Sequence, residues 1–238
     1  MTTWTPKRHT AMHYQHLQHG ATLFNEDDWE LVAYYSSVES EKNVRNKGVG
    51  ISDISHIGKL YLQGKNLAKD ISRIIGLQAP DNHKMLRSTI KLNKETNIAV
   101  NFCKLGEDEA FITCDGHQLN HIASFITKES GGSIDVVDMS SNFAGIRIIG
   151  PLSSTLLSKL TDLDIRESKF PNYSCAQVMS SEIYSIMIHN NIGNISSFEI
   201  YVTRDFGVYT WDAILDAGEE LNIAQIGIES LRQIIDGA

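Results

Sequence analysis

The sequence feature that most constrains the fold is a short pattern that occurs twice. The segments "GKLYLQGKNL" (58–67) and "GIRIIGPL" (145–152) each run from a strand-like stretch through a glycine into the start of a helix-like stretch. A short internal repeat of this kind is typical of related structural units. Because a sheet and a helix each bury one apolar face against the other, we predict an α+β fold with two related sheet-and-helix modules. The modules would occupy residues 1–140 and 141–238, either as separate units or interleaved in one compact unit.

The rest of the chain continues this alternation of strand and helix patterns. Runs rich in β-branched residues and bounded by turn residues predict strands, at 49–55, 58–64, 87–93, 97–105, 109–115, 133–139, 144–150, 175–190 (two strands) and 197–202. Apolar residues at three- and four-residue spacing, or charged stretches closed by glycine, predict helices, at 38–48, 65–76, 117–132, 151–160 and 206–218. The predicted elements leave no long flexible linker.

Charge and composition exclude several classes of protein. The net charge of −8 argues against broad binding to nucleic acid, which needs a basic surface. No apolar run approaches the roughly 18–20 residues that span a bilayer, and residues 1–10 lack the apolar core of a signal peptide. Three cysteines without a C-x-x-C pair suggest a reducing compartment. We therefore expect a cytoplasmic protein that binds neither nucleic acid nor membrane.

Four of the nine histidines lie in "RHTAMHYQHLQHGA" (8–21), at His9, His13, His16 and His19. Their spacing of four, three and three predicts that they line one face of a helix. Two histidines one turn apart can share a metal ion, but a stable site needs further ligands and a second shell. One helix cannot bring four imidazoles around a single ion, and the neighbouring side chains supply no carboxylate. We therefore expect a solvated or packed helix face and no metal.

The stretch "GVGISDISHIGKLYLQG" (48–64) joins two strand-like runs through Asp53, Ser55, His56 and Lys59. It resembles the matching block of the aminomethyltransferase family, the glycine-cleavage T-protein and its relatives. Further blocks resemble the family in the same order, at 13–48, 104–112, 145–165, 196–223 and 229–234. The resemblance implies the family's folate-binding fold and a role in tetrahydrofolate-linked one-carbon metabolism, without the small C-terminal β-barrel of full-length family enzymes. Within the block, Asp53 and His56 either contact a ligand or orient the loop by local hydrogen bonds.

Two residues match positions that hold the pterin ring in the family. The last residue of its Gly-Glu-x-Gly-[Phe/Trp]-Glu turn matches Glu199, and the arginine of its Ser-Leu-Arg block matches Arg232. A carboxylate suits a pterin because it can accept two parallel N–H bonds from the amino-pyrimidine edge. The resemblance therefore implies tetrahydrofolate as a cofactor, held by Glu199 and Arg232. The residues alone favour a mutual surface ion pair or two unrelated charges.

The sequence departs from the family at the catalytic position and at the glycine-rich turn. Family enzymes carry an Asp-Asp pair on the strand before a hairpin, and one of these acids assists one-carbon transfer. The hairpin matches residues 105–108 of this sequence, which places the pair at Ile98 and Ala99. General acid–base help of this kind is worth about 10²–10⁴-fold. The turn at 194–199 lacks the family's glycines, which permit close approach of a ligand. We therefore assign no catalytic residue, and we expect weak or absent catalysis and poor folate binding at best.

A further section, "LTDLDIRESKFPNYSCAQVM" (160–179), resembles the gamma subunit of heterotetrameric sarcosine oxidase, which is regarded as an accessory subunit. Three functions therefore stay open. The chain is a degenerate aminomethyltransferase-like protein, a non-catalytic gamma-like subunit of a sarcosine oxidase or demethylase complex, or a simple folate-binding protein. The second function implies oxidase or demethylase subunits as partners, and a homodimer is the alternative assembly.

Overall fold

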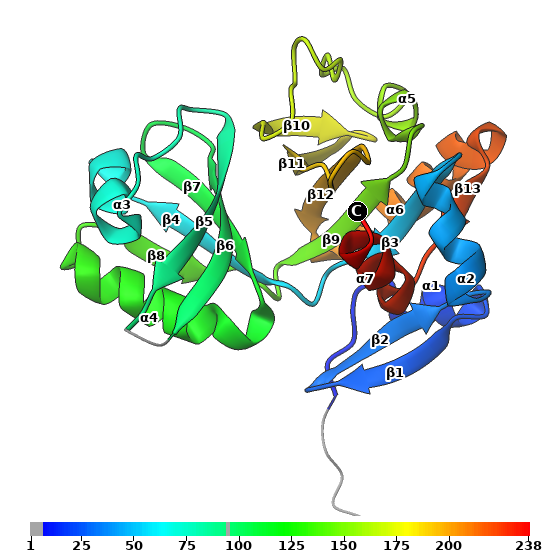
Figure 1. The fold of residues 1–238 in the computed structure, drawn as a ribbon, viewed down its shortest axis with the longest axis horizontal. Helices are drawn as coiled ribbons and strands as arrows, with labels where there is room; N and C mark the ends of the chain where they lie inside the picture. The colour runs from blue at the N-terminus through cyan, green and yellow to red at the C-terminus, as the bar shows by residue number, and fades with distance from the viewer. Residues whose placement is uncertain (1–6, 94–95) are drawn as a thin grey trace, which may run out of the picture.

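The computed structural model describes residues 7–93 and 96–238. Within them, two sheets of five and six strands dominate the fold, and a two-stranded hairpin lies near the N-terminus. Figure 1 shows the two sheet units beside each other, with the hairpin of β1 (Thr22–Glu26) and β2 (Trp29–Tyr34) below the six-stranded unit. This combination of sheets and helices confirms the predicted α+β fold.

The five-stranded sheet is antiparallel throughout, in the order β5-β6-β7-β4-β8. Its strands are β4 (Gly58–Gln63), β5 (Lys84–Lys91), β6 (Asn97–Lys104), β7 (Glu109–Cys114) and β8 (Asp135–Asp138). One face packs against two helices, α3 (Leu67–Ile75) and α4 (Leu119–Ser130). Because side chains alternate along a strand, Ile98 and Val100 of β6 enter this core, whereas Ala99 and Asn101 lie on the opposite face.

The six-stranded sheet has the order β10-β11-β12-β9-β3-β13, with β13 parallel to β3 and the other pairs antiparallel. Its strands are β3 (Val49–Asp53), β9 (Phe143–Ile149), β10 (Cys175–Ser180), β11 (Ile183–His189), β12 (Ser197–Thr203) and β13 (Ile223–Gln225). The remaining helices are α1 (His13–Gln18), α2 (Val38–Glu41), α5 (Ser153–Leu157), α6 (Gly207–Gly218) and α7 (Ile228–Asp236). Short 3₁₀ turns lie at Lys42–Arg45, Gly116–Gln118, Arg204–Phe206 and Glu219–Leu221. Helices α5 and α6 bury one face of the sheet around Trp211. No helix in the described ranges is long and apolar enough to cross a membrane.

The chain passes from the six-stranded sheet to the five-stranded sheet and back. β3 belongs to the six-stranded sheet, β4 to β8 build the other sheet, and β9 returns to pair with β3. Residues of both sheets share one buried core, in which the rings of Phe111 and Tyr201 lie 5.2 Å apart between centroids. Strand pairing thus joins residues 49–53 to strands of the second half, and the module boundary between residues 140 and 141 stays a prediction.

The histidine stretch differs from the single helix face expected from its spacing. Helix α1 begins only at His13, so His9 precedes it and His19 caps its end. His16 is buried, with Nε2 2.9 Å from Asp53 Oδ2 and Nδ1 2.8 Å from the hydroxyl of Tyr35. The expected row of four is therefore wrong, because the helix is too short to hold them. The histidines lie in different environments.

Candidate functional site

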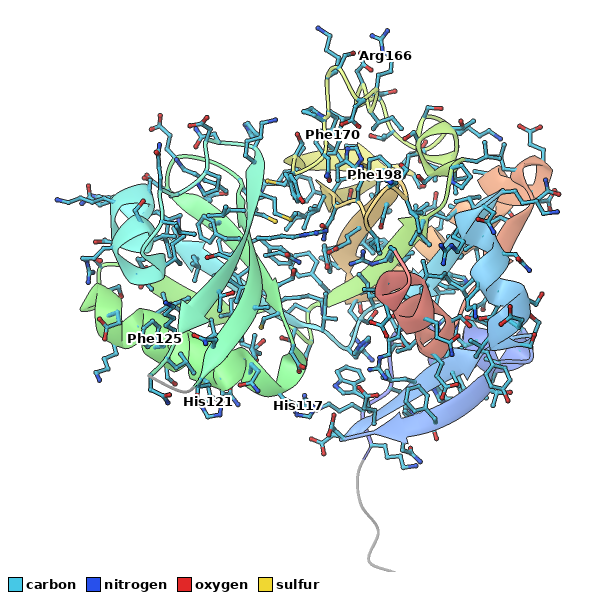
Figure 2. The ribbon with its side chains drawn as sticks, in the orientation of Figure 1. His117, His121, Phe125, Arg166, Phe170 and Phe198 are labelled. Atoms are coloured by element: carbon cyan, nitrogen blue, oxygen red, sulfur yellow. The ribbon has the colours of Figure 1, made fainter. Side chains whose placement is uncertain are left out.

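A cavity of about 700 Å³ lies where the two sheets meet the β1–β2 hairpin. Its walls come from β5, β6 and β7 of one sheet, from β9 and β12 of the other, from the hairpin and from α7. His117, just before α4 (Figure 2), contacts Asp27 at the tip of the hairpin, and both residues line the cavity. A volume of this size falls in the roughly 300–1,000 Å³ range of small-molecule sites. The cavity is therefore the candidate ligand site.

Glu199, on β12, is 1% exposed and lies in the cavity wall. Its Oε1 accepts hydrogen bonds from Arg147 Nη2 at 2.6 Å and Asn190 Nδ2 at 2.7 Å, and its Oε2 accepts one from the Tyr201 hydroxyl at 2.5 Å. Arg147 stands directly opposite Glu199 in the antiparallel register of β9 and β12, which is why the two charges meet. A carboxylate has about four acceptor sites. One acceptor site on Oε2 therefore has no hydrogen-bond partner among the described residues.

The hydroxyl of Tyr201 stays a hydrogen-bond donor to this carboxylate. Burial of the ring, followed by the neighbouring Glu199 charge, raises the pKa of Tyr201 well above its usual value. The phenol therefore keeps its proton near neutral pH. Arg147, Asn190 and Tyr201 together compensate a carboxylate that would otherwise be costly to bury.

Arg232, on α7, also lies in the cavity wall. Its Nη1 and Nη2 donate to the two carboxylate oxygens of Glu26, at 2.7 and 2.5 Å. These hydrogen bonds lower the pKa of Glu26 and hold α7 against the end of β1. The structure thus brings Glu199 and Arg232 to one cavity but gives each its own partner. The alternative of a mutual surface ion pair is therefore wrong.

The two positions that the family resemblance aligns with catalytic acids lie on opposite faces of β6. Ala99 lines the cavity, whereas Ile98 is 4% exposed and packs in the core under α3 and α4. On the cavity face, the next residue is Asn101, whose amide nitrogen donates to Thr113 Oγ1 at 3.2 Å. The cavity therefore has a methyl group at this position, and a methyl group cannot exchange a proton.

Asp53 and His56 have separate roles in the structure. Asp53 accepts a hydrogen bond from the backbone N–H of Ser55 at 2.8 Å and so orients the loop after β3. Burial acts to raise the pKa of Asp53, but the hydrogen bond and charge of His16 outweigh it and lower the pKa to about 2. His56 lines the cavity, and burial lowers its pKa to about 4. His56 is therefore neutral at pH 7, and its Nδ1 has no hydrogen-bond partner among the described residues.

Besides Arg147, two arginines of the cavity wall were not identified from the sequence. The guanidinium of Arg8 lies 5.9 Å from the ring centroid of Trp29, and that of Arg87 lies 5.3 Å from the ring centroid of Tyr173. Arg87 also donates to the backbone carbonyl of Asn191 at 2.7 Å. Neither arginine takes part in an ion pair within residues 7–93 and 96–238. No sequence motif marks them, because only the fold brings them to the cavity.

The fold is similar to that of aminomethyltransferase T. The chain matches the crystal structure of glycine cleavage system aminomethyltransferase T from Bartonella henselae with a TM-score of 0.83 and 13% sequence identity, over 96% of this chain and 62% of that one. It also matches a chain of heterotetrameric sarcosine oxidase from Corynebacterium sp. U-96, with a TM-score of 0.62 and 16% identity. That match covers 79% of this chain and 93% of the oxidase chain.

Residues 12–234 match the GCVT N-terminal domain, and the chain belongs to this family. Aminomethyltransferases of Halothermothrix orenii and Oceanobacillus iheyensis are each 23% identical to it, over 90% and 93% of this chain. The chain spans 60% and 62% of the length of these two relatives. The family resemblance predicted from the sequence blocks is therefore confirmed.

Proposed function

We propose that the chain is an aminomethyltransferase-like protein of one-carbon metabolism that binds tetrahydrofolate in the cavity and transfers one-carbon units weakly or not at all. One observation carries this proposal. The cavity wall contains Glu199 and Arg232, which the family resemblance assigns to the pterin, but has Ala99 where that resemblance expects an acid. The membership of the chain in its family is compatible with this role. We also propose a cytoplasmic location.

The residues of the cavity fit a reduced folate. The free acceptor site on Glu199 Oε2 can take one N–H of the amino-pyrimidine edge. Trp29 offers a ring face in the wall, and the guanidinium group of Arg8 can pair with a carboxylate of the glutamate tail. Bound tetrahydrofolate would supply the amine nitrogen that accepts the one-carbon unit.

The same carboxylate explains why the expected binding is weak. Arg147 and Asn190 already occupy Oε1, so a pterin gains only one of two parallel bonds unless one of them moves. A hydrogen bond to a charged group contributes about 1.5–3 kcal/mol. The loss of one such bond therefore weakens binding by about 10- to 100-fold relative to a fully available carboxylate.

Catalysis is expected to be weak because the chain places no proton acceptor at position 99. The test restores the acid with Ala99→Asp and measures formation of methylene-tetrahydrofolate from an aminomethyl donor. Ser88→Asp, which places an acid elsewhere in the same cavity wall, is the matched control. We expect little or no turnover by the wild type and by Ser88→Asp, and faster turnover by Ala99→Asp. Turnover by the unmodified chain as fast as that by Ala99→Asp would refute the degenerate assignment.

A second candidate is a non-catalytic subunit of an oxidase or demethylase complex. It is favoured by the match that covers 93% of a sarcosine oxidase chain, so that the two have similar extent. Affinity purification from the native host distinguishes the candidates. A flavin-containing partner in one-to-one amount supports the subunit, whereas a lone chain or a homodimer with saturable folate binding supports the free-standing protein.

A further inference from the structure

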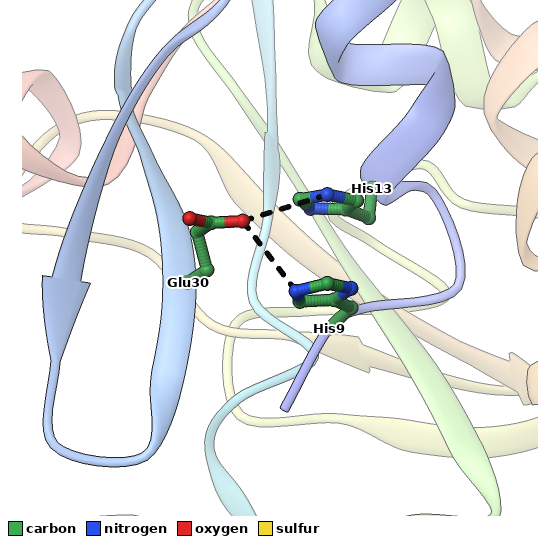
Figure 3. Close-up of side chains that lie close together, drawn as sticks. All are labelled: His9, His13 and Glu30. Atoms are coloured by element: carbon green, nitrogen blue, oxygen red, sulfur yellow. Dashed lines mark ion pairs between the residues drawn. The ribbon is translucent and has the colours of Figure 1, made fainter. Parts of the chain in front are cut away.

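His9, His13 and Glu30 form a cluster of potential metal ligands outside the cavity (Figure 3). The Nε2 atoms of His9 and His13 lie 3.4 and 3.5 Å from the same oxygen, Oε2 of Glu30. The three ligand atoms are all within 4.8 Å of one another. Glu30 comes from β2 and supplies the carboxylate that the histidine stretch itself lacks.

The spacing of these atoms suits an ion better than hydrogen bonds. An N–H···O hydrogen bond spans about 2.7–3.2 Å, and both nitrogen–oxygen distances are longer. Zinc binds nitrogen and carboxylate oxygen at about 2.0–2.2 Å, so ligand atoms at the corners of a tetrahedron lie about 3.3–3.5 Å apart. The observed distances from the two nitrogens to Glu30 Oε2 match this edge length.

The two imidazole rings stack with centroids 3.9 Å apart and planes 9° from parallel. An imidazole holds a metal ion in the plane of its ring, so the more exposed ring, His9, would turn to bring both Nε2 lone pairs to one ion. Lys7 lies 3.7 Å from the other oxygen of Glu30, Oε1, so Oε2 stays available. The side chains of His9 and Glu30 are 40% and 24% exposed, which leaves a route for an ion.

We propose that His9, His13 and Glu30 bind one divalent transition-metal ion of the zinc class, with water as a fourth ligand, and that this ion fastens the N-terminal segment to β2. The segment already pairs with β2: Arg8 forms an isolated parallel bridge with Trp29, and Arg8 O accepts from the N–H of Glu30 at 3.0 Å. Alternation puts His9 and Glu30 on the face opposite Arg8 and Trp29. The ion would therefore fix a segment whose other face lines the cavity.

Isothermal titration of the tag-free, metal-free chain with Zn²⁺ tests this proposal. We expect one ion per chain, and we expect His9→Gln and Glu30→Gln each to weaken binding by at least about tenfold, the lower end of the loss seen even for outer-shell partners. His121→Gln, at an exposed histidine on α4 (Figure 2), should leave the affinity unchanged. Binding that is absent, or equally strong in all three variants, would overturn the site.

A measurement on the unmodified chain protects the test against variants that fail to fold. X-ray absorption of the zinc-loaded chain should give two imidazole nitrogens and further oxygen ligands at about 2.0–2.2 Å. Imidazole nitrogen NMR should assign the changes on zinc addition to His9 and His13. Sulfur ligands, or changes confined to other histidines, would contradict the proposal.

Discussion

Replacing Glu199 by glutamine removes the charge that Arg147 faces across β9 and β12. The side chains are 1% and 12% exposed, so the arginine would keep its charge in a site with little water. Removing one partner of a buried ion pair costs about 3–5 kcal/mol of unfolding free energy, because the other charge is left uncompensated. In a chain of this size each kcal/mol shifts the melting temperature by about 2–4 °C. Glu199→Gln should therefore lower it by about 6–20 °C.

Thermal unfolding followed by circular dichroism measures this effect. Glu220→Gln breaks an exposed ion pair with Lys159 and should leave the melting temperature unchanged. The double variant Glu199→Gln/Arg147→Met removes both buried charges and should recover most of the loss. If Glu199→Gln melts within about 2 °C of the wild type, or if the double variant melts no higher than the single one, the reasoning fails.

Three further predictions follow from the same structure. The pKa of His56 is 6.5 in the unfolded chain and about 4 in the fold. Its stabilising contribution is therefore complete above about pH 6.5 and is lost as the pH falls toward 4. The free energy of unfolding, measured across this range, should depend less on pH in His56→Gln than in the wild type. A Cβ at Gly227 would lie 2.0 Å from the backbone oxygen of Ala33, so Gly227→Ala should displace α7 and destabilise the chain by more than about 2 kcal/mol in urea unfolding. Arg8→Gln should weaken binding of tetrahydrofolate by about tenfold but leave a pterin without the glutamate tail unaffected, as competition titrations can measure.

Sequence patterns predicted the elements of the fold because strand alternation and helix spacing are local properties. The helix expected at 206–218 is α6 (Gly207–Gly218), and the strand expected at 97–105 is β6 (Asn97–Lys104). The pattern at 151–160 overestimated its helix, since α5 ends at Leu157. The family blocks placed Ala99 on the strand that lines the cavity. Because side chains alternate along a strand, Ile98 lies on the opposite face, in the core.

The partners of the site residues could not be predicted, because they come from distant parts of the chain. Arg147 meets Glu199 through the register of β9 and β12, 52 positions away, and Arg232 meets Glu26 over 206 positions. Glu30 reaches the histidines only because the segment before α1 pairs with β2. Each pairing depends on tertiary packing, for which a single sequence carries no local signal.

Titration of the purified chain with tetrahydrofolate, with methylene-tetrahydrofolate formation followed in the same sample, tests the central claim most directly. Quenching of tryptophan fluorescence reports binding, because Trp29 lies in the cavity wall. We predict weak, saturable binding of one tetrahydrofolate per chain, reduced further by Glu199→Gln, and little or no product from an aminomethyl donor. Absence of saturable binding, or turnover by the unmodified chain as fast as that by Ala99→Asp, would contradict the claim.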